Sequence, residues 1–280
     1  MVEHTIGTTP PRVMTIAGTD SGGGAGAAAD LRTFAVCGVH GCVAVTAVTV
    51  QNSVGVTGVH TVPPETVAAQ IEAVATDIGL DAVKTGMLAT TEIIEAIVEA
   101  CDRCGIGGDG PVPLVVDPVA ASMHGDPLLA DSALDAYRTL LFPRATVITP
   151  NLDEVRLLVG IDVHDRAAQY EAAKLLHALG PRHVVVKGGH LREDTDTCVD
   201  VHFDGDTFTE HTGPRFATGN THGGGDTMSA AIAAALAKGQ SPAEAIAFGK
   251  RLIVESVRHS YPLGAGHGPV SPLWAVPSWT

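Results

Sequence analysis

The sequence predicts a three-layer α/β/α sandwich built around a mostly parallel β-sheet. Short β-branched runs alternate along the chain with longer segments whose apolar residues recur with helical period, which is the pattern of repeated βαβ units. Hydrophobic residues make up 45% of the 280 residues and aromatic residues only 4%, so the core has to be largely aliphatic. This composition excludes disordered, collagen-like and coiled-coil chains.

Strands are expected where short apolar runs stand between turn residues. These runs are Val13–Ala17, Val43–Thr49, Ala82–Thr85, Leu114–Asp117, Thr146–Thr149 and Val184–Lys187. The helices expected between them are Ala25–Cys37, Pro64–Asp77, Thr91–Cys104, Asp131–Leu140, Leu152–Val159 and Asp165–Leu179. Pro64 in a first turn and Gly105 and Gly180 just past helix ends support these boundaries.

Other stretches add to this alternation. Extra strand material is expected at Val54–Val62, and a small β-hairpin at Cys198–Phe203 with Phe208–His211. Two helices, Thr227–Lys238 and Pro242–His259, are predicted to follow, and then a turn-rich tail, Gly264–Pro272. Residues 1–12 are expected to be a disordered lead-in to a single domain over residues 13–280.

The charge balance excludes some partners. The chain has 31 Asp and Glu against 17 Lys and Arg, a formal net charge of -14, and no block of basic residues, so no nucleic-acid surface is expected. An anionic ligand must therefore be held by local groups. The longest apolar runs, Val43–Val50 and Ala230–Ala237, are too short to span a bilayer, and the first residues do not resemble a signal peptide. A soluble cytoplasmic protein without membrane contact is expected.

The cysteines do not indicate a metal or redox centre. Five cysteines in a chain of this length argue against a disulfide framework. Cys101 and Cys104 form a C-x-x-C pair, but they close a predicted helix and no second pair follows at zinc spacing. Ordinary helix positions are expected for both.

The first glycine-rich segment runs from Gly18 to Gly26, between a predicted strand and a predicted helix. Part of it fits the dinucleotide fingerprint G-x-G-x-x-A, yet no acid lies between Leu31 and Pro64 to bind a ribose, and the chain has no P-loop motif. We expect a turn that contacts a ligand at the end of a strand. The alternative is a turn that only lets the helix pack closely.

The second glycine-rich segment, Asn220–Thr227, opens a predicted helix. Gly223, Gly224 and Gly225 leave backbone N–H groups uncovered at the positive end of the helix dipole, which makes an anion hole. Asp226 would lie among these donors, where capping the helix is the alternative role. Together they suit phosphoryl transfer, with the glycines stabilising the phosphoryl group and Asp226 accepting the proton of the acceptor alcohol.

Further polar residues follow other predicted strands. Asn151 and Glu154 fall on one helical face, where they could orient a hydrated Mg²⁺ or form a capping box, and the spacing fits both equally. Lys187 supplies a cation for a nucleotide, and Asp117 occupies the same kind of position. Because open α/β sheets bind ligands at the carboxyl ends of their strands, we expect these groups to converge there.

These motifs resemble those of the ribokinase-like kinases of small alcohols and vitamins, through Gly-x-Gly-Asp before a helix, Asn-x-x-Glu upstream and Gly-Gly near the start. Almost the whole chain is similar to the hydroxymethylpyrimidine/phosphomethylpyrimidine kinases of thiamine biosynthesis. The segments that carry this resemblance are TIAGTDSGGGAG, VTAVTVQN, KTGML, VVDPV, GDPLL, TPNLDE, VVKGGH, HGGGDT and GHGPV.

The resemblance implies ATP-dependent phosphorylation of 4-amino-5-hydroxymethyl-2-methylpyrimidine and then of its monophosphate. It implies that Gln51 hydrogen-bonds the pyrimidine edge, that Asp226 is the base and that Gly223–Gly225 form the anion hole. The pocket would be lined by Gly18, Asp30, Met87 and Val119. ATP would be bound by Lys187, Asn151 and Thr221, and Mg²⁺ by Glu154 and, through water, Asp117. A homodimer and a role for a monovalent cation are also implied.

The chain departs from the family pattern at two places. Many such kinases have a cysteine where this chain has Asp226, and a bulkier Ile-Gln pair where it has Ala27 and Ala28. A carboxylate is the better base at neutral pH than an unperturbed thiol, but it lies beside a substrate phosphate in the second reaction. We therefore expect the first phosphorylation to gain and the second to slow. Alternative functions are a pyridoxal or pyridoxine kinase, a non-catalytic pyrimidine-binding module, and a nicotinamide dehydrogenase, which the missing ribose acid disfavours.

Overall fold

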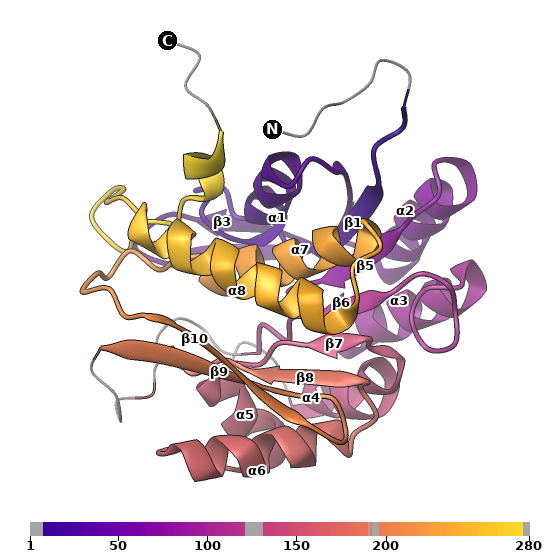
Figure 1. Cartoon of the computed structure of the whole chain (residues 1–280). Helices are drawn as coiled ribbons and strands as arrows, with labels where there is room; N and C mark the ends of the chain where they lie inside the picture. The colour runs from indigo at the N-terminus through magenta and orange to yellow at the C-terminus, as the bar shows by residue number, and fades with distance from the viewer. Residues whose placement is uncertain (1–7, 121–130, 190, 192–195, 277–280) are drawn as a thin grey trace.

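The computed structural model describes residues 8–120, 131–189, 191 and 196–276, and its centre is an eight-stranded sheet in the order β10-β9-β8-β7-β6-β5-β1-β2 (Figure 1). The strands are β1 (Arg12–Ala17), β2 (His40–Val45), β5 (Ala82–Thr85), β6 (Leu114–Val116), β7 (Val147–Ile148), β8 (His183–Val186), β9 (Thr197–Phe203) and β10 (Phe208–Pro214). Neighbours from β2 to β8 are parallel, whereas β9 and β10 are added antiparallel at one edge. The predicted mostly parallel sheet is confirmed.

Helices cover both faces of the sheet, which confirms the three layers (Figure 1). One face carries α1 (Gly26–Val36), α7 (Gly224–Ala237) and α8 (Pro242–Arg258). The other carries α2 (Pro64–Asp77), α3 (Thr91–Cys104), α4 (Asp131–Ala136), α5 (Leu152–Val159) and α6 (Arg166–His177). Successive residues of β1 enter different cores, Val13 on the first face and Met14 on the second. A strand buried on both faces is apolar throughout, which is why these strands appear as continuous hydrophobic runs.

The predicted strand Val43–Thr49 is wrong as a single element. The backbone leaves the main sheet at Thr46, whose N–H donates to Ala17 O at 3.1 Å. Beyond it, β3 (Ala47–Gln51) pairs antiparallel with β4 (Val56–Thr61) in a separate two-stranded sheet, which we call the flap. β-branched residues suit both sheets equally, so the apolar pattern contains no sign of the break.

The hairpin prediction is confirmed, because β9 and β10 pair through Phe203 and Phe208, but the hairpin extends the main sheet instead of standing apart from it. β1 begins at Arg12, inside the expected lead-in, because Arg12 pairs with Asp81 at 2.9 Å. Residues 1–7, the GDPLL motif at 125–129 and His190 lie outside the described residues.

Several helix ends differ from their predicted positions. The helix expected at Asp131–Leu140 changes after Ala136 into a π-helical turn, Tyr137–Leu141, and then a 3₁₀ turn, Phe142–Arg144. α7 begins at Gly224, three residues before the predicted start, so two of the three glycines and Asp226 belong to its first turn. All five cysteines are free thiols, and Cys101 and Cys104 lie in the last turn of α3, as expected. In the described part of the chain, every helix is too short or too polar to cross a membrane.

Candidate active site

Polar groups from several strand ends meet at one edge of the sheet, opposite the N-terminus of α7. Lys187, just after β8, places its Nζ 3.1 Å from Oδ1 of Asp117, which follows β6. Asp117 also accepts hydrogen bonds from Thr149 Oγ1 at 3.2 Å and from Ser229 Oγ at 3.3 Å. A Cβ on Gly225 would lie 2.9 Å from Lys187 Nζ, so the first turn of α7 lies directly against this ion pair. The predicted convergence of Asp117, Lys187 and Gly225 is confirmed.

A second ion-pair cluster lies beside the first and contains Asp226. The Nζ of Lys84, on β5, is 3.2 Å from Asp226 Oδ1 and 3.0 and 2.9 Å from the two carboxylate oxygens of Asp30. Asp30 also accepts a 2.6 Å hydrogen bond from Thr15 Oγ1. Lys84 and Asp30 have no exposed surface, whereas the side chain of Asp226 is 13% exposed. Of these three groups, Asp226 alone can touch a ligand directly, and Asp30 acts on it through Lys84.

The charges of this cluster keep Asp226 ionised. Burial raises the pKa of Asp226, but the charge and hydrogen bond of Lys84 and the N–H of Gly26 lower it more, so its pKa falls below the usual value. Burial raises the pKa of Asp30 to about 7, despite the opposing charge of Lys84. One lysine therefore serves two carboxylates, and the one that faces outward stays negative at neutral pH.

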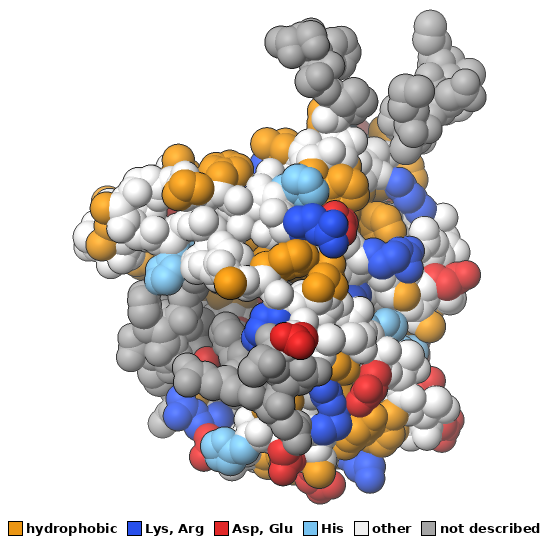
Figure 2. Space-filling model, turned by 60° about the vertical axis from the view of Figure 1, so that its left-hand side comes forward, with side chains coloured by type: hydrophobic (Ala, Val, Ile, Leu, Met, Phe, Trp, Pro, Cys, Tyr) orange, Lys and Arg blue, Asp and Glu red, His pale blue; other side chains and the backbone are white. Residues whose placement is uncertain are grey.

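The start of α7 is built for close approach to another molecule. Its N-cap, Gly223, adopts a left-handed conformation with φ 72°, and no side chain caps the helix. A Cβ on Gly223 would collide with the carbonyl oxygen of Gly24, so the two glycine-rich segments touch backbone to backbone. On the face shown in Figure 2, the described Lys and Arg side chains are scattered among acidic and apolar ones. The helix end and Lys187 are thus the local positive groups that an anion would meet.

Asn151 and Glu154 form a capping box. Glu154 N donates to Asn151 Oδ1 at 2.9 Å, and Asn151 N donates to Glu154 Oε2 at 2.7 Å. Glu154 also accepts from Ala120 N at 3.3 Å, and burial raises its pKa to about 7, although the charge of Lys187 opposes this. The spacing left two alternatives open, and the structure confirms the capping one.

The residues near Asp117 also fit a magnesium ion that arrives with a nucleotide. Within the described ranges, no group of three or more His, Cys, Asp or Glu side chains could hold a metal by itself. Mg²⁺ commonly binds through one or two carboxylates, water and substrate phosphates. Asp117 and Glu154 could supply such oxygen ligands, directly or through water, and both interact electrostatically with Lys187.

The remaining predicted residues lie around this centre. Gly18 and Met87 touch, since a Cβ on Gly18 would lie 2.5 Å from Met87 Cε. Gln51 ends β3 in the flap, where its Oε1 accepts from Thr49 Oγ1 at 3.3 Å. Val119 follows β6 with a strained φ of 44°, and Thr221 is exposed before α7. Their contacts with substrate or ATP stay predictions.

The family model described as phosphomethylpyrimidine kinase matches residues 20–271 of this chain. The chain belongs to the phosphomethylpyrimidine kinase family. A relative from Mycobacterium tuberculosis, named hydroxymethylpyrimidine/phosphomethylpyrimidine kinase, is 59% identical over 270 residues, covering 96% of each chain. The solved pyridoxal kinase of Bacillus subtilis in complex with ADP matches with a TM-score of 0.86 and 37% identity, over 95% of this chain and 98% of that one. The phosphomethylpyrimidine kinase of Clostridium difficile matches with a TM-score of 0.76 and 36% identity, over 88% and 99%.

Lys84 was not identified as a site residue from the sequence of this member of the phosphomethylpyrimidine kinase family. Lys84 stands in a strand whose other residues, Ala82, Val83 and Thr85, are all buried, so the strand pattern alone indicates core. The signal that could have found it is the lysine itself, because a charged residue in a fully buried strand needs partners.

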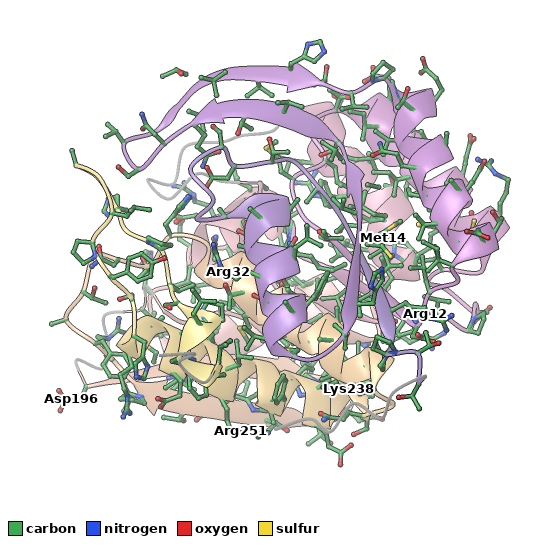
Figure 3. All side chains as sticks on the ribbon, turned by 90° about the horizontal axis from the view of Figure 1, so that it is seen from above. Arg12, Met14, Arg32, Asp196, Lys238 and Arg251 are labelled. Carbon is green, nitrogen blue, oxygen red and sulfur yellow. The ribbon has the colours of Figure 1, made fainter. Side chains whose placement is uncertain are left out.

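A second missed pair is Asp20 and His222, whose carboxylate oxygen and Nε2 are 2.9 Å apart. Asp20 also accepts from the N–H groups of Gly22, Gly24 and Ala25 at 2.8 to 3.0 Å. Asp before a glycine-rich turn is a known sign of such local capping. In Figure 3, Arg32 lies on the side of α1 that faces the pale yellow C-terminal segment, and its Nη1 donates to Gly23 O at 2.8 Å. The first glycine-rich turn is thus held by its own Asp20, by Arg32 of the helix that follows and by the distant His222.

Proposed function

We propose that this protein transfers the γ-phosphoryl group of ATP to the hydroxymethyl group of 4-amino-5-hydroxymethyl-2-methylpyrimidine, and then a second one to the resulting monophosphate, in thiamine biosynthesis. The observation that carries the proposal is the position of Asp226. An ionised carboxylate at an uncapped helix N-terminus, beside Lys187, combines a proton acceptor with groups that stabilise phosphate charge.

In the first reaction, the substrate hydroxyl oxygen forms a bond to the γ-phosphorus while the bond from phosphorus to the β–γ bridging oxygen breaks. The hydroxyl proton passes to Asp226, and ADP leaves with the bond electrons. The transition state of such transfers is loose, so the proton moves late and a carboxylate of low pKa suffices. Within the proposed anion hole of Gly223–Gly225, the N–H of Gly224 donates to Thr221 O at 3.1 Å, so the N–H groups of Gly223 and Gly225 and the ammonium of Lys187 would stabilise the transferring group. Bound at Asp117 and Glu154, Mg²⁺ would neutralise phosphate charge.

The other site roles belong to the same proposal. Gln51 presents an amide donor and an acceptor that match the edge of the aminopyrimidine, and Met87 packs against the flat ring beside Gly18. Asn151 and Thr221 contact ATP, and Asp30 holds Lys84 in place. We also propose a cytoplasmic homodimer. Light scattering on the purified protein tests the dimer, and potassium replaced by sodium in the assay tests the monovalent cation.

The test is product analysis after incubation with Mg·ATP and the pyrimidine, with pyridoxal in a parallel reaction. Resolved by mass, a pyrimidine monophosphate followed by a diphosphate is the expected result. Pyridoxal phosphate alone would assign the protein to vitamin B6 salvage, the second candidate, which similarity to the Bacillus subtilis pyridoxal kinase favours. Absence of product from both substrates would contradict a kinase and favour a non-catalytic binding module.

A further inference from the structure

The segment 263–270, which contains the GHGPV motif, has no role in the transfer described above. Its end is fixed to the body of the protein, because Val270 is buried and Ser271 N donates to Ser256 O of α8 at 2.9 Å. The rest of the segment runs across the surface between the flap and the start of α7. In Figure 3, the purple flap strands and the pale yellow segment approach one another on the left of the view.

At one end, the segment holds the turn of the flap. His267 N donates to Ser53 O at 3.0 Å, and Gly266 N donates to Ser53 Oγ at 3.2 Å. A Cβ on Gly266 would collide with the carbonyl oxygen of Ser53, so only glycine permits this approach. Ser53 stands two residues after Gln51, so the contact fixes the part of the flap that carries the proposed pyrimidine ligand.

At the other end, the segment holds the residue before the anion hole. His222 N donates to Gly268 O at 3.2 Å, and Val270 N donates to His222 O at 3.1 Å, which makes a short parallel bridge. His222 immediately precedes Gly223, the N-cap of α7. A movement of the segment therefore moves both the flap turn and the entrance to the phosphate-binding helix.

Two further contacts lead from His222 back to the flap, so that the flap, the segment 263–270 and the first glycine-rich turn form a closed ring of contacts. The side chain of His222 lies 2.9 Å from the carboxylate of Asp20. Ser21, which follows Asp20 in the chain, exchanges hydrogen bonds of 2.7 and 2.8 Å with the backbone of Gln51. These contacts border an open pocket of about 270 Å³, which is lined among others by Asn52 and Leu263.

The first half of β3 is also held by Thr19, whose N–H donates to Ala47 O at 2.9 Å and which exchanges hydrogen bonds of 3.1 and 2.8 Å with Thr49. The outer valines of the flap, such as Val50 at 63% exposure, face away from the protein, so the segment 263–270 acts on the turn beyond Gln51.

We infer that the segment 263–270 positions the flap according to what is bound at the start of α7, so that nucleotide and pyrimidine bind cooperatively. The inference rests on the proposed function for the identity of the two ligands. The contacts at Ser53 and His222 are its physical basis: a nucleotide that orders the N-terminus of α7 orders His222, and through Gly268 and Gly266 it orders the turn that follows Gln51.

The decisive variant is Gly266→Ala, with Gly55→Ala as its matched control. Both place one methyl group near the flap turn, but a Cβ on Gly55 meets nothing within 4 Å. Ser53→Ala is a milder second variant that removes only the hydrogen bond from Gly266 N. Pyrimidine affinity is measured by calorimetry without and with a saturating non-hydrolysable ATP analogue, and amide hydrogen exchange of the flap is followed under the same two conditions.

In the wild type, the analogue is expected to tighten pyrimidine binding by about fivefold or more and to slow exchange in β3 and β4. Gly55→Ala is expected to behave like the wild type. In Gly266→Ala, the ratio of pyrimidine affinities with and without the analogue should fall toward one, and the amides of the flap should exchange fast under both conditions. In steady-state kinetics of Gly266→Ala with saturating Mg·ATP and varied pyrimidine, KM for the pyrimidine is expected to rise more than kcat falls. Unchanged cooperativity in Gly266→Ala and Ser53→Ala would overturn the inference. Failure of the proposed function is distinguishable, because the exchange of the flap responds to the analogue even where the pyrimidine is not a substrate.

Discussion

The face of the sheet beneath α1, α7 and α8 carries two buried ion-pair clusters that differ in charge balance. At the strand ends, one lysine, Lys84, serves two carboxylates, Asp30 and Asp226. At the antiparallel edge, Lys250 of α8 and Asp200 of β9 form a one-to-one pair at 2.8 Å. The balanced pair needs no further ion, whereas the cluster at the strand ends holds a surplus negative charge that a proton or a substrate can use. We attribute to this surplus the proposed reactivity of one cluster and the structural role of the other.

The groups around the two clusters also differ in charge. Beside Asp200 and Lys250 lie the imidazole rings of His183, His202 and His211, with 3.1 Å between His183 Nδ1 and His202 Nε2. Burial, and to a smaller extent the other rings, lowers the pKa of His202 to about 4, so the ring is neutral at physiological pH. The edge is thus filled with neutral polar groups, and the strand ends with charged ones.

The largest expected effect comes from removing the surplus charge itself. Asp226→Asn keeps the size of the side chain but abolishes the proton acceptor, so kcat should fall by roughly 10²–10⁴ with an unchanged circular dichroism spectrum. Asp200→Asn, the same change in the edge pair, should retain the wild-type kcat and lose thermal stability. A wild-type kcat in Asp226→Asn would contradict its role as the base.

Replacing the two lysines tests the comparison directly. Without Lys84, Asp30 and Asp226 lose their shared cation, so the pKa of Asp226 rises, and the acid limb of the pH profile of kcat/KM should move up by about 1–3 units in Lys84→Met. Lys250→Met should leave this profile in place and lower the free energy of unfolding by about 3–5 kcal/mol, since it leaves Asp200 buried and unpaired. Identical pH profiles in Lys84→Met and the wild type would show that Lys84 does not set the charge of Asp226.

The two clusters should also give opposite slopes of stability against pH. Asp30 has a pKa of about 7 when folded against 3.8 as the reference, so the native state binds its proton more tightly and the free energy of unfolding falls as pH rises from about 4 to 7. His202, at about 4 against 6.5, does the reverse, and its contribution to stability is lost as pH falls through this window. Each slope is at most about 1.4 kcal/mol per pH unit.

Urea unfolding at about pH 5, 6 and 7 separates the two contributions. Relative to the wild type, Asp30→Asn should shift the slope of the unfolding free energy against pH in the positive direction, and His202→Gln should shift it in the negative direction. The signs are the test, because the absolute stability of both variants also includes lost contacts. Parallel curves for the two variants would refute the assigned protonation states.

The smallest effect is expected from Asp226→Cys, which exchanges the carboxylate for the residue common in similar kinases. Removing one negative charge beside the substrate phosphate should raise the ratio of the second to the first phosphorylation rate by roughly threefold to tenfold, since about 1 kcal/mol of repulsion corresponds to about a fivefold change in rate. Both rates are measured with purified pyrimidine and monophosphate. An unchanged ratio of the two rates would show that the charge at position 226 does not cause any difference between the Asp226 and Cys forms.

The sequence was sufficient for the alternation of strands and helices and for the edge at which Asp117, Lys187 and Asp226 meet, because buried parallel strands and ligand-binding strand ends have strong local patterns. It was insufficient where the outcome depends on distant partners. The strand ends at Thr46 because its hydroxyl donates to Met87 O and its carbonyl accepts from Val62 N. Lys84 is tolerated in a buried strand because of Asp30 and Asp226. Neither partnership is visible within a local window of residues.

The distribution of thiols has a consequence for covalent inhibition. Burial raises the pKa of Cys37 to about 11 and that of Cys101 to about 12, which leaves both unreactive at neutral pH. Cys42 lies on β2, Cys104 on α3 and Cys198 on β9, and the first turn of α7 carries Asp226 in place of a thiol. An alkylating reagent that disables kinases with a cysteine at that position finds a carboxylate here, so this chain should keep its activity in the presence of such compounds.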